Sequence, residues 1–415
     1  MVLFRHSMRR FVREGSLEIQ TSNGESFIVG DGSPPSCGIR LADVRAELEL
    51  LFDPEMALGE LYAAGRMELT RGGLADLLAI GARNVAAPGK ARPIAAWQAV
   101  RRLRQRAAAV APRRARANAA YHYDLDTGLY RLFLDDDLQY SCAFFETPSD
   151  SLEAAQLAKK RHIAAKLAVS PGMTALEIGC GWGGLALYLA SRCGVAVKGV
   201  TLADEQLGVA RRRAAAAGLA GRVEFALEDY RETHGRFDRI VSVAMFEHVG
   251  PRKYDAFFKA VADLLAEDGV ALIHTIGHCG LPVPTSPWMR KYIFPDGYIP
   301  SLAEIARAVA RAGLLVADLE ILREHYALTL EHWRARFAAR RDEAKAIYGE
   351  RFCRIWEFYL AASQSAFRHL GFVVFQLQLT KKPNVLPITR DYIAEREADL
   401  RGSLAFRQPR RAARS

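Results

Sequence analysis

The feature that most constrains the fold of this chain is a regular alternation between residues 151 and 381. Helix-forming stretches alternate there with seven short apolar runs. The runs lie at 174–178, 196–200, 223–227, 239–243, 271–274, 314–320 and 372–381. Strands that alternate with helices mostly pair in parallel, and the helices then cover both faces of the sheet. We therefore predict an α/β fold with a mostly parallel, seven-stranded sheet.

A long helical insertion separates the last two runs. It spans 324–370 and carries aromatic residues and arginines at helical spacing. An insertion of this kind is either a lid over a ligand site or additional core, and we favour the lid. The whole chain has 415 residues, which is too long for one ordinary domain and indicates two.

The first 90 residues are predicted to form a small α+β domain. Two alternating runs flank Asn23-Gly24, a pair that favours a hairpin because both residues tolerate positive φ. The expected elements are strands at 17–21 and 26–29, a helix capped by Asp43 that ends at Phe52, and a short helix at 74–80.

The net charge of +10 indicates a polyanionic partner, which is either nucleic acid or an anionic lipid surface. The excess of basic residues gathers at the start of the chain, in a linker at 91–120 and in a tail at 396–415. None of these segments has the pattern of a nucleic-acid-binding module. We therefore expect a lipid surface and no nucleic acid.

The basic start of the chain has two interpretations. Residues 1–13 can be wound as a helix with Phe4, Met8 and Phe11 on one side and arginines elsewhere, the pattern of a segment that lies on a membrane. In the alternative, this segment is a solvated terminus whose apolar side chains anchor it to its own domain. The sequence favours neither.

The cysteines and the apolar runs bear on the compartment. Six cysteines are scattered without a Cys-x-x-Cys pair, which argues against a zinc or dithiol site and agrees with a reduced cytoplasm. No apolar run is long enough to cross a bilayer, and the basic start lacks the apolar core of a signal peptide. We expect a cytoplasmic protein without a metal.

A glycine-rich loop follows the first run of the sheet. Gly179, Gly181 and Gly184 allow a tight turn and a close approach of cofactor atoms, and they also satisfy a dinucleotide-binding pattern. Two observations favour S-adenosylmethionine. Glu177 would repel a phosphate but pair with a cationic amino-acid moiety. The second run ends in Thr201 instead of an acid placed for the ribose of NAD.

Polar residues end several of the parallel runs, where such sheets bind ligands. They are Glu177, Thr201, Asp229, Glu247 and His274. Asp229 can accept a hydrogen bond from an adenine amine, and Tyr230 can stack on the ring. Each residue taken alone agrees equally well with a helix cap or a turn.

Seven strings along the chain form a set. They are Tyr140-Ser141-Cys142-Ala143-Phe144-Phe145, Glu177 to Gly184, Gly199-Val200-Thr201-Leu202, Phe246-Glu247-His248-Val249-Gly250, His274-Thr275-Ile276-Gly277, Tyr292-Ile293-Phe294-Pro295 and Tyr326-Ala327-Leu328-Thr329-Leu330. In this order they resemble the cyclopropane-fatty-acyl-phospholipid synthase family, which includes mycolic acid cyclopropane synthase-like methyltransferases. The resemblance is close from 121 to about 380. It implies a Rossmann-like methyltransferase domain at 121–395 and, more loosely, covers the N-terminal unit.

The resemblance also implies a reaction. A methylene passes from S-adenosylmethionine to the cis double bond of a phospholipid acyl chain, through a carbocation that a bound bicarbonate deprotonates. Side chains of Glu247, His274 and Tyr326 would hold the bicarbonate together with the backbone at Cys142 and Ile276. The Cys142 thiol lacks an adjacent base, so we assign it a positional role. His248 is interpreted as structural support for the turn at Glu247.

The same resemblance assigns the cofactor contacts and the place of action. The contacts are Tyr140, Ser141, Glu177, Gly179, Gly181, Thr201, Leu202, Gln206, Asp229 and Tyr230. Acyl chains at the inner face of the membrane would be the partner, with anionic lipid favoured, peripheral association expected and a homodimer left open. The main rival is a methyltransferase that makes a 10-methyl-branched chain. A non-catalytic lipid- or nucleic-acid-binding protein with this fold is the alternative from another class.

Overall fold

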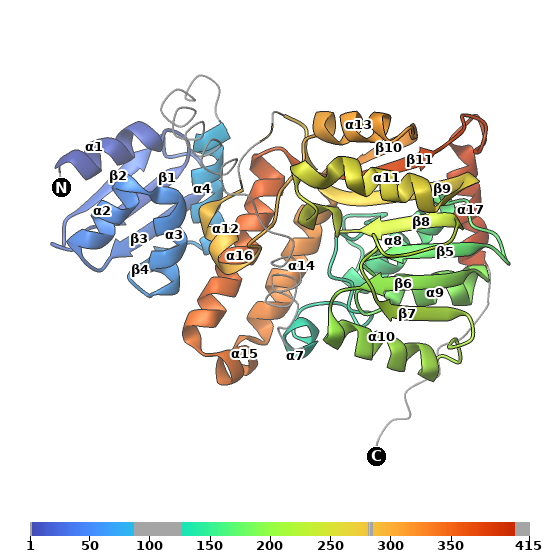
Figure 1. Ribbon diagram of the computed structural model, residues 1–415. Coiled ribbons are helices and arrows are strands. Elements are labelled where there is room, and N and C mark those ends of the chain that lie inside the picture. Colours follow the sequence, from blue (N-terminus) through green and yellow to red (C-terminus); the bar gives the residue numbers. More distant parts are fainter. Residues whose placement is uncertain (1, 87–126, 281, 283–284, 403–415) are drawn as a thin grey trace, which may run out of the picture.

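The computed structural model describes residues 2–86, 127–280, 282 and 285–402 (Figure 1). The predicted basic linker and most of the predicted tail lie outside these residues. Two sheets are present, one of four strands near the N-terminus and one of seven strands. The helices of the insertion lie between them (Figure 1).

The large sheet confirms the α/β prediction. Its strands are β5 (Thr174–Ile178), β6 (Ala196–Thr201), β7 (Val223–Leu227), β8 (Phe237–Val243), β9 (Leu265–His278), β10 (Leu315–Leu322) and β11 (Phe372–Thr380). Their order is β10-β11-β9-β8-β5-β6-β7, and β11 is antiparallel to both of its neighbours. The chain fills one side of β5 with β6 and β7 and then crosses to β8, so the strand order reverses between β5 and β8.

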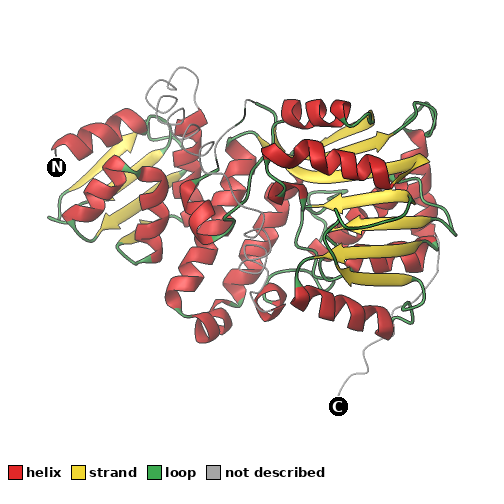
Figure 2. Cartoon of the chain, viewed as in Figure 1, coloured by secondary structure: helices red, strands yellow, loops and turns green. Residues whose placement is uncertain are grey.

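Helices cover both faces of this sheet (Figure 2). One face packs on α8 (Leu152–Lys166), α9 (Gly184–Cys193) and α10 (Asp204–Ala216), and the other on α11 (Tyr254–Leu264) and α13 (Leu302–Arg311). The period-2 alternation of strand side chains explains the two cores. In β5, Ala175 joins the first core, and Leu176 and Ile178 join the second. Helix α17 (Asp391–Gly402) packs on α8.

The N-terminal unit has a sheet in the order β2-β1-β3-β4. Its elements are α1 (Val2–Phe11), β1 (Ser16–Gln20), β2 (Ser26–Gly30), β3 (Ser36–Leu41), α2 (Val44–Phe52), α3 (Pro54–Ala63), β4 (Met67–Arg71) and α4 (Leu74–Ala86). The predicted hairpin is confirmed, because β1 and β2 pair antiparallel. The predicted cap is confirmed as well, since the Ala46 amide donates to Asp43 Oδ1 at 2.8 Å.

Helix α1 exists, but its apolar side faces the protein. Phe4 is 3% exposed and packs edge-on against Phe27, with ring centroids 6.4 Å apart. Met8 and Phe11 also pack on the core of the N-terminal unit. Of the two interpretations left open by the sequence, the structure therefore supports the one in which these side chains anchor the segment to its own domain, and not the one in which they face a membrane. Val2 and Leu3 are the exposed apolar residues of α1.

The insertion is helical as predicted. It consists of α14 (His325–Ala339), α15 (Arg341–Tyr348) and α16 (Glu350–His369). Helix α16 packs on α14 and also on α3 and α4 of the N-terminal unit. Buried side chains of the insertion and of the N-terminal unit belong to one hydrophobic cluster. The insertion is thus core shared with the N-terminal unit, and its role as a lid over the ligand site stays a prediction.

Candidate active site

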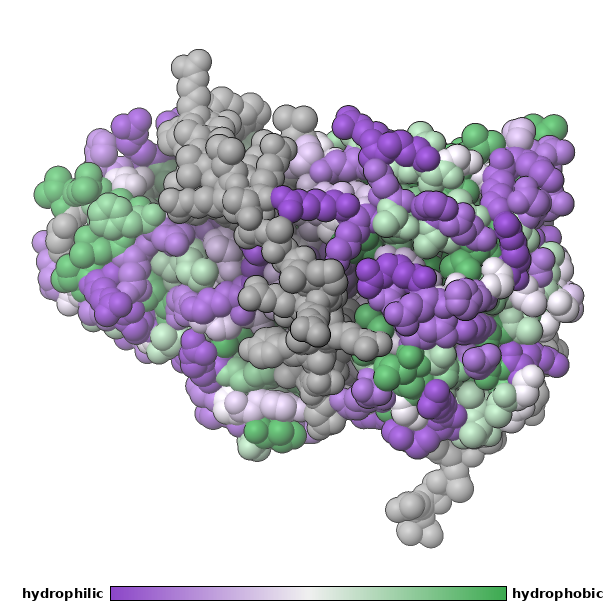
Figure 3. Space-filling model, viewed as in Figure 1, coloured by the Kyte–Doolittle hydropathy of each residue, from purple (hydrophilic) through white to green (hydrophobic). Residues whose placement is uncertain are grey.

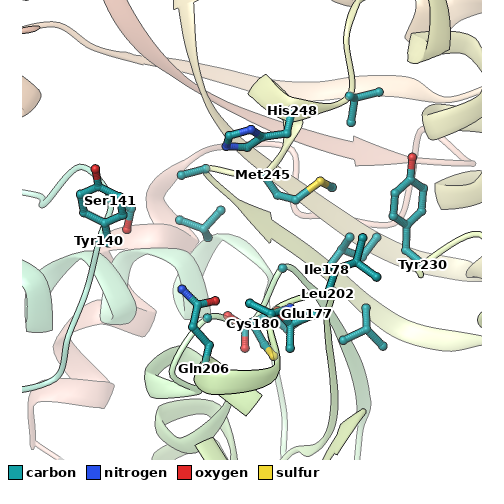
Figure 4. Close-up of a pocket in the computed structure, with 18 of the residues that line it drawn as sticks. Tyr140, Ser141, Glu177, Ile178, Cys180, Leu202, Gln206, Tyr230, Met245 and His248 are labelled. Atoms are coloured by element: carbon teal, nitrogen blue, oxygen red, sulfur yellow. The ribbon is translucent and has the colours of Figure 1, made fainter. Parts of the chain in front are cut away.

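A cavity of about 240 Å³ lies beyond the carboxyl ends of β5, β6 and β8, where the strand order reverses. The ten residues predicted to contact a cofactor all line it: Tyr140, Ser141, Glu177, Gly179, Gly181, Thr201, Leu202, Gln206, Asp229 and Tyr230. Tyr140 and Ser141 approach from one side and Tyr230 from the other (Figure 4). Segments distant in sequence thus converge on one ligand-sized space.

The glycine loop between β5 and α9 shapes one wall. Gly179 and Gly181 both have positive φ, +84° and +51°. A Cβ on Gly179 would lie 2.9 Å from Cβ of Met245, whereas a Cβ on Gly181 would meet no protein atom within 4 Å. Gly179 is therefore required for packing. Gly181 leaves open the space into which a ligand would fit.

Glu177 is a buried carboxylate that lacks a full set of partners. It is 3% exposed, and burial raises its pKa to about 8. Among the described residues, nothing bonds its Oε2. A cationic amine would supply the missing donor and favour the ionised form. The residue therefore suits the amino group of S-adenosylmethionine.

Three of the predicted cofactor contacts, Thr201, Asp229 and Tyr230, already interact with other residues of the protein. Thr201 Oγ1 accepts from the Ala203 amide at 3.2 Å, which leaves its own hydrogen for another acceptor. The Asp229 carboxylate accepts from Arg231 Nε at 2.9 Å. Tyr230 packs edge-on against Phe257, with centroids 5.4 Å apart. Asp229 is therefore shared with a neighbouring guanidinium, which the sequence did not reveal.

His248 also lines the cavity, with Met245 (Figure 4). The sequence interpretation gave it only structural support of a turn. Burial lowers its pKa to about 4, so the imidazole is neutral near pH 7. In the sequence, the available signal was the position of His248 next to Glu247 and five residues after the end of β8.

Glu247 lies in the short 3-10 helix η1 (Phe246–His248), and the cavity-lining residues Met245 and His248 flank it in the chain. Its Oε1 accepts from the Ile276 amide at 2.6 Å. In the described part of the chain its Oε2 has no partner, and burial raises its pKa to about 7. The backbone at Ile276 was predicted to hold bicarbonate, and in the structure its amide donates to Glu247.

His274 offers the complementary group. It lies on β9 opposite Gln376 of β11, whose amide nitrogen is 3.2 Å from His274 Nδ1. With the Gln376 amide nitrogen toward Nδ1, the imidazole accepts at Nδ1 and carries its hydrogen on Nε2. Burial holds the pKa of His274 well below its ordinary value, and nothing in the described ranges accepts from Nε2. His274 Nε2 and Glu247 Oε2 are thus two buried polar atoms that the described residues leave without a hydrogen-bond partner.

Cys142 and Tyr326 belong to the hydrophobic cluster that borders these groups, as does Ile276. Burial raises the pKa of the Cys142 thiol, which agrees with a positional role. The Tyr326 ring meets Trp333 edge-on with centroids 5.8 Å apart, and Trp333 in turn stacks on Tyr140. None of the five residues predicted for catalysis lines the cavity.

Comparison with known proteins decides the family. The family described as mycolic acid cyclopropane synthetase matches residues 111–377, more than half of the chain. The chain belongs to this family. The seven strings named from the sequence all fall inside the matched residues.

Two curated members of the cyclopropane synthetase group are informative. The cyclopropane-fatty-acyl-phospholipid synthase of Escherichia coli is 43% identical over 260 residues, which is 63% of this chain and 66% of that enzyme. A tuberculostearic acid methyltransferase of Mycobacterium tuberculosis is 41% identical over 281 residues, 65% of this chain and 66% of that protein. The alignments thus span slightly less than two thirds of each relative's length.

Solved structures agree with this family. A mycolic acid cyclopropane synthase, CmaA1, in complex with SAH and CTAB matches with a TM-score of 0.61 and 34% identity. The match covers 64% of this chain and 97% of that structure. The cyclopropane synthase MmaA2 from Mycobacterium tuberculosis gives the same TM-score at 32% identity.

Proposed function

We propose that this protein is a cyclopropane-fatty-acyl-phospholipid synthase. In this proposal it adds a methylene from S-adenosylmethionine across the cis double bond of an unsaturated phospholipid acyl chain. S-adenosylmethionine would supply an electrophilic methyl group, and bicarbonate would supply the base for the proton lost on ring closure. The observation that carries the proposal is that two buried atoms, Glu247 Oε2 and His274 Nε2, lack partners in segments that adjoin the cavity-lining residues His248 and Ala244.

The side chains present can perform the tasks that this reaction needs. Glu177 would take the amino group of the cofactor, and Gly181 leaves room beside it. Ionised Glu247 would accept from the hydroxyl of bicarbonate, while His274 Nε2 would donate to one of its other oxygens. The aromatic cluster around Trp333 would exclude water from the carbocation.

The related methyltransferase that makes a 10-methyl-branched chain is the alternative, and one relative carries such a name. The two products differ in composition. Ring formation adds CH₂ and consumes the alkene, whereas methylation followed by reduction adds CH₂ and two further hydrogens. Ring closure removes a proton from the new methyl group, and the buried groups of Glu247 and His274 suit a base for that step. The composition of the product distinguishes the two reactions.

Lipid mass spectrometry tests the proposal. The chain is expressed in a host that lacks cyclopropane lipids, and its acyl chains are compared with those of a host without it. A gain of CH₂ on monounsaturated chains, with resistance of the product to mild hydrogenation of alkenes, supports the proposal. A gain of CH₄ supports the branched-chain alternative. Unchanged lipids in a host that contains the folded protein contradict both.

We also propose that the domain at 1–90 docks on the membrane, and that the protein associates with it peripherally. Of the helices in the described part of the chain, none has the length and apolar character that crossing a bilayer requires. The N-terminal unit exposes an N-terminal apolar patch, visible at that end of the molecule in Figure 3. The patch consists of Val2, Leu3, Ile28, Val44, Leu48 and Phe52.

Charge supports a lipid surface as the occupant of this patch. Arg5, Arg9, Arg10 and Arg45 are exposed on the same two helices that carry most of the patch. Apolar side chains beside exposed arginines are typical of surfaces that bind anionic lipid. We therefore propose that the membrane contacts this N-terminal apolar patch, and that the buried side of α1 does not contact it.

A further inference from the structure

Lys159 is a buried cation that the proposed reaction does not use. It lies on α8 and has no exposed surface. Its Nζ donates to Gln139 Oε1 and to Ser141 Oγ, both at 2.7 Å. Two other lysines of the same helix, Lys160 and Lys166, form ion pairs with Asp137 and Glu320. In the described ranges no carboxylate forms an ion pair with Lys159.

Helix α8 holds the segment 139–141 with two side chains that lie one turn apart. Gln156 Nε2 donates to the carbonyl oxygens of Gln139 at 3.1 Å and of Ser141 at 3.0 Å. Lys159 bonds the side chains of the same two residues. Four hydrogen bonds therefore fix this segment, which forms part of the cavity wall.

The bond from Lys159 determines what Ser141 can offer. An ammonium has donors only, so Ser141 Oγ accepts from Lys159 and its own hydrogen is directed elsewhere. Ser141 lines the cavity, as Glu177 does on another wall (Figure 4). Asp135 and Asp137 act on the Lys159 ammonium without a direct ion pair, so part of its burial cost remains, and an anion bound by the Ser141 hydroxyl would compensate it.

We infer that Lys159 is a positioning residue for the carboxylate at the amino-acid end of the cofactor. It fixes Ser141 so that the hydroxyl donates to this carboxylate, while Glu177 receives the ammonium of the same α-carbon. The positive charge of Lys159, acting through Ser141, thereby favours the carboxylate of the amino acid, and the negative charge of Glu177 favours its ammonium. The inference rests on the proposed function, since it requires S-adenosylmethionine as the ligand.

Three ligands with two, one and no charged groups test the inference. S-adenosylhomocysteine keeps the carboxylate and the amine, its decarboxylated analogue keeps only the amine, and 5′-methylthioadenosine has neither. Calorimetry on the full chain should show that Lys159→Met weakens S-adenosylhomocysteine by about 10- to 100-fold, the range for a hydrogen bond to a charged group. The other two affinities should stay within about twofold. Lys166→Met, which removes an equally buried lysine of α8 that does not contact 139–141, should leave all three unchanged.

The pH profile gives a second measurement. Burial lowers the pKa of Lys159 to about 8, so the wild type should lose affinity for S-adenosylhomocysteine as the pH rises through 8. Lys159→Met should lack this alkaline loss. The charged and titratable groups that act on Lys159 or feel its charge are Asp135, Asp137, Cys142, Lys160, Glu177 and His274. Binding of the decarboxylated analogue depends on the ionisation of Glu177 but not on that of Lys159, so its pH profile separates the contributions of the two residues.

Each outcome decides the inference. A selective loss for S-adenosylhomocysteine supports it, whereas an equal loss for all three ligands, or no loss, overturns it. If Lys159→Met does not fold, Ser141→Ala should show the same selectivity while Lys159 stays in place. A folded wild type that does not bind S-adenosylhomocysteine at all would instead contradict the proposed function.

Discussion

Replacing Glu247 by glutamine tests the arrangement behind the cavity, because the shape is kept and the charge is lost. Glutamine retains an oxygen that can accept from the Ile276 amide, as Oε1 does at 2.6 Å. It places an NH₂ group where Oε2 now lies, and this group cannot accept from a bicarbonate hydroxyl. A hydrogen bond to a charged group is worth about 1.5 to 3 kcal/mol, so turnover should fall by at least about ten-fold.

The same substitution should stabilise the fold above neutral pH. Burial raises the pKa of Glu247 from 4.5 to about 7, so the folded state holds this proton more tightly than the unfolded chain. The contribution to stability is therefore present below the unfolded pKa and is lost as the pH rises through the folded pKa. At about 1.4 kcal/mol per pKa unit, the ionised side chain destabilises the fold by about 3 kcal/mol near pH 8, which glutamine avoids.

Urea unfolding and turnover measure the two effects. Unfolding is followed at about pH 4.5 and pH 8 in carbonate-free buffer, and turnover by transfer of labelled methyl groups to vesicle lipid. Glu177→Gln is the matched comparison, since burial raises its pKa as well, and it should gain stability but lose cofactor affinity. The reasoning fails if Glu247→Gln and the wild type show the same pH dependence of stability. It also fails if Glu247→Gln loses cofactor binding and keeps its turnover.

Three further outcomes are expected. Gly181→Val should abolish S-adenosylhomocysteine binding, because the valine side chain would enter the cavity. Gly218→Val is the control, since Gly218 also has positive φ and open space around it, and it should bind normally. Equal binding by both variants would show that the cofactor does not lie beside Gly181. Activity should fall in carbonate-free buffer and recover saturably with added bicarbonate, and Tyr326→Phe should raise the half-effective concentration; full activity without carbonate would make Glu247 the base. Phe52→Ser should lower co-sedimentation with anionic vesicles at low salt, and Ile347→Ser, a similarly exposed change on α15, should not; identical losses would exclude the N-terminal apolar patch.

The large sheet and the cofactor wall could be predicted because their signals are local and repeated. Each strand of the large sheet corresponds to an apolar run in the sequence. Parallel strands place their carboxyl ends at the same edge, so Glu177, Thr201 and Asp229 were expected to converge. Strands β3 and β4 gave no such signal. Their runs are short and include exposed Arg40 and Glu68, and they become strands by pairing with each other and with β1.

Partners within the site could not be predicted in the same way. The bond from Ile276 to Glu247 and that from Arg231 to Asp229 depend on side-chain directions that only tertiary packing fixes. The face of α1 was equally ambiguous, since Phe4 suits a protein core and a membrane alike. Packing against Phe27 decides it.

The cluster shared by α16 and the N-terminal unit makes the two halves of the chain inseparable by truncation. Trp288 packs against Gly59 so closely that a Cβ there would lie 2.3 Å from the indole nitrogen, and Phe358 packs on both Trp288 and Tyr62. A fragment cut to residues 111–377, the part that the family shares, would expose the buried rings of Trp288 and Phe358. Such a fragment would present an apolar face along α16 and self-associate, so the part of the chain that carries the large sheet depends on the N-terminal unit for its solubility.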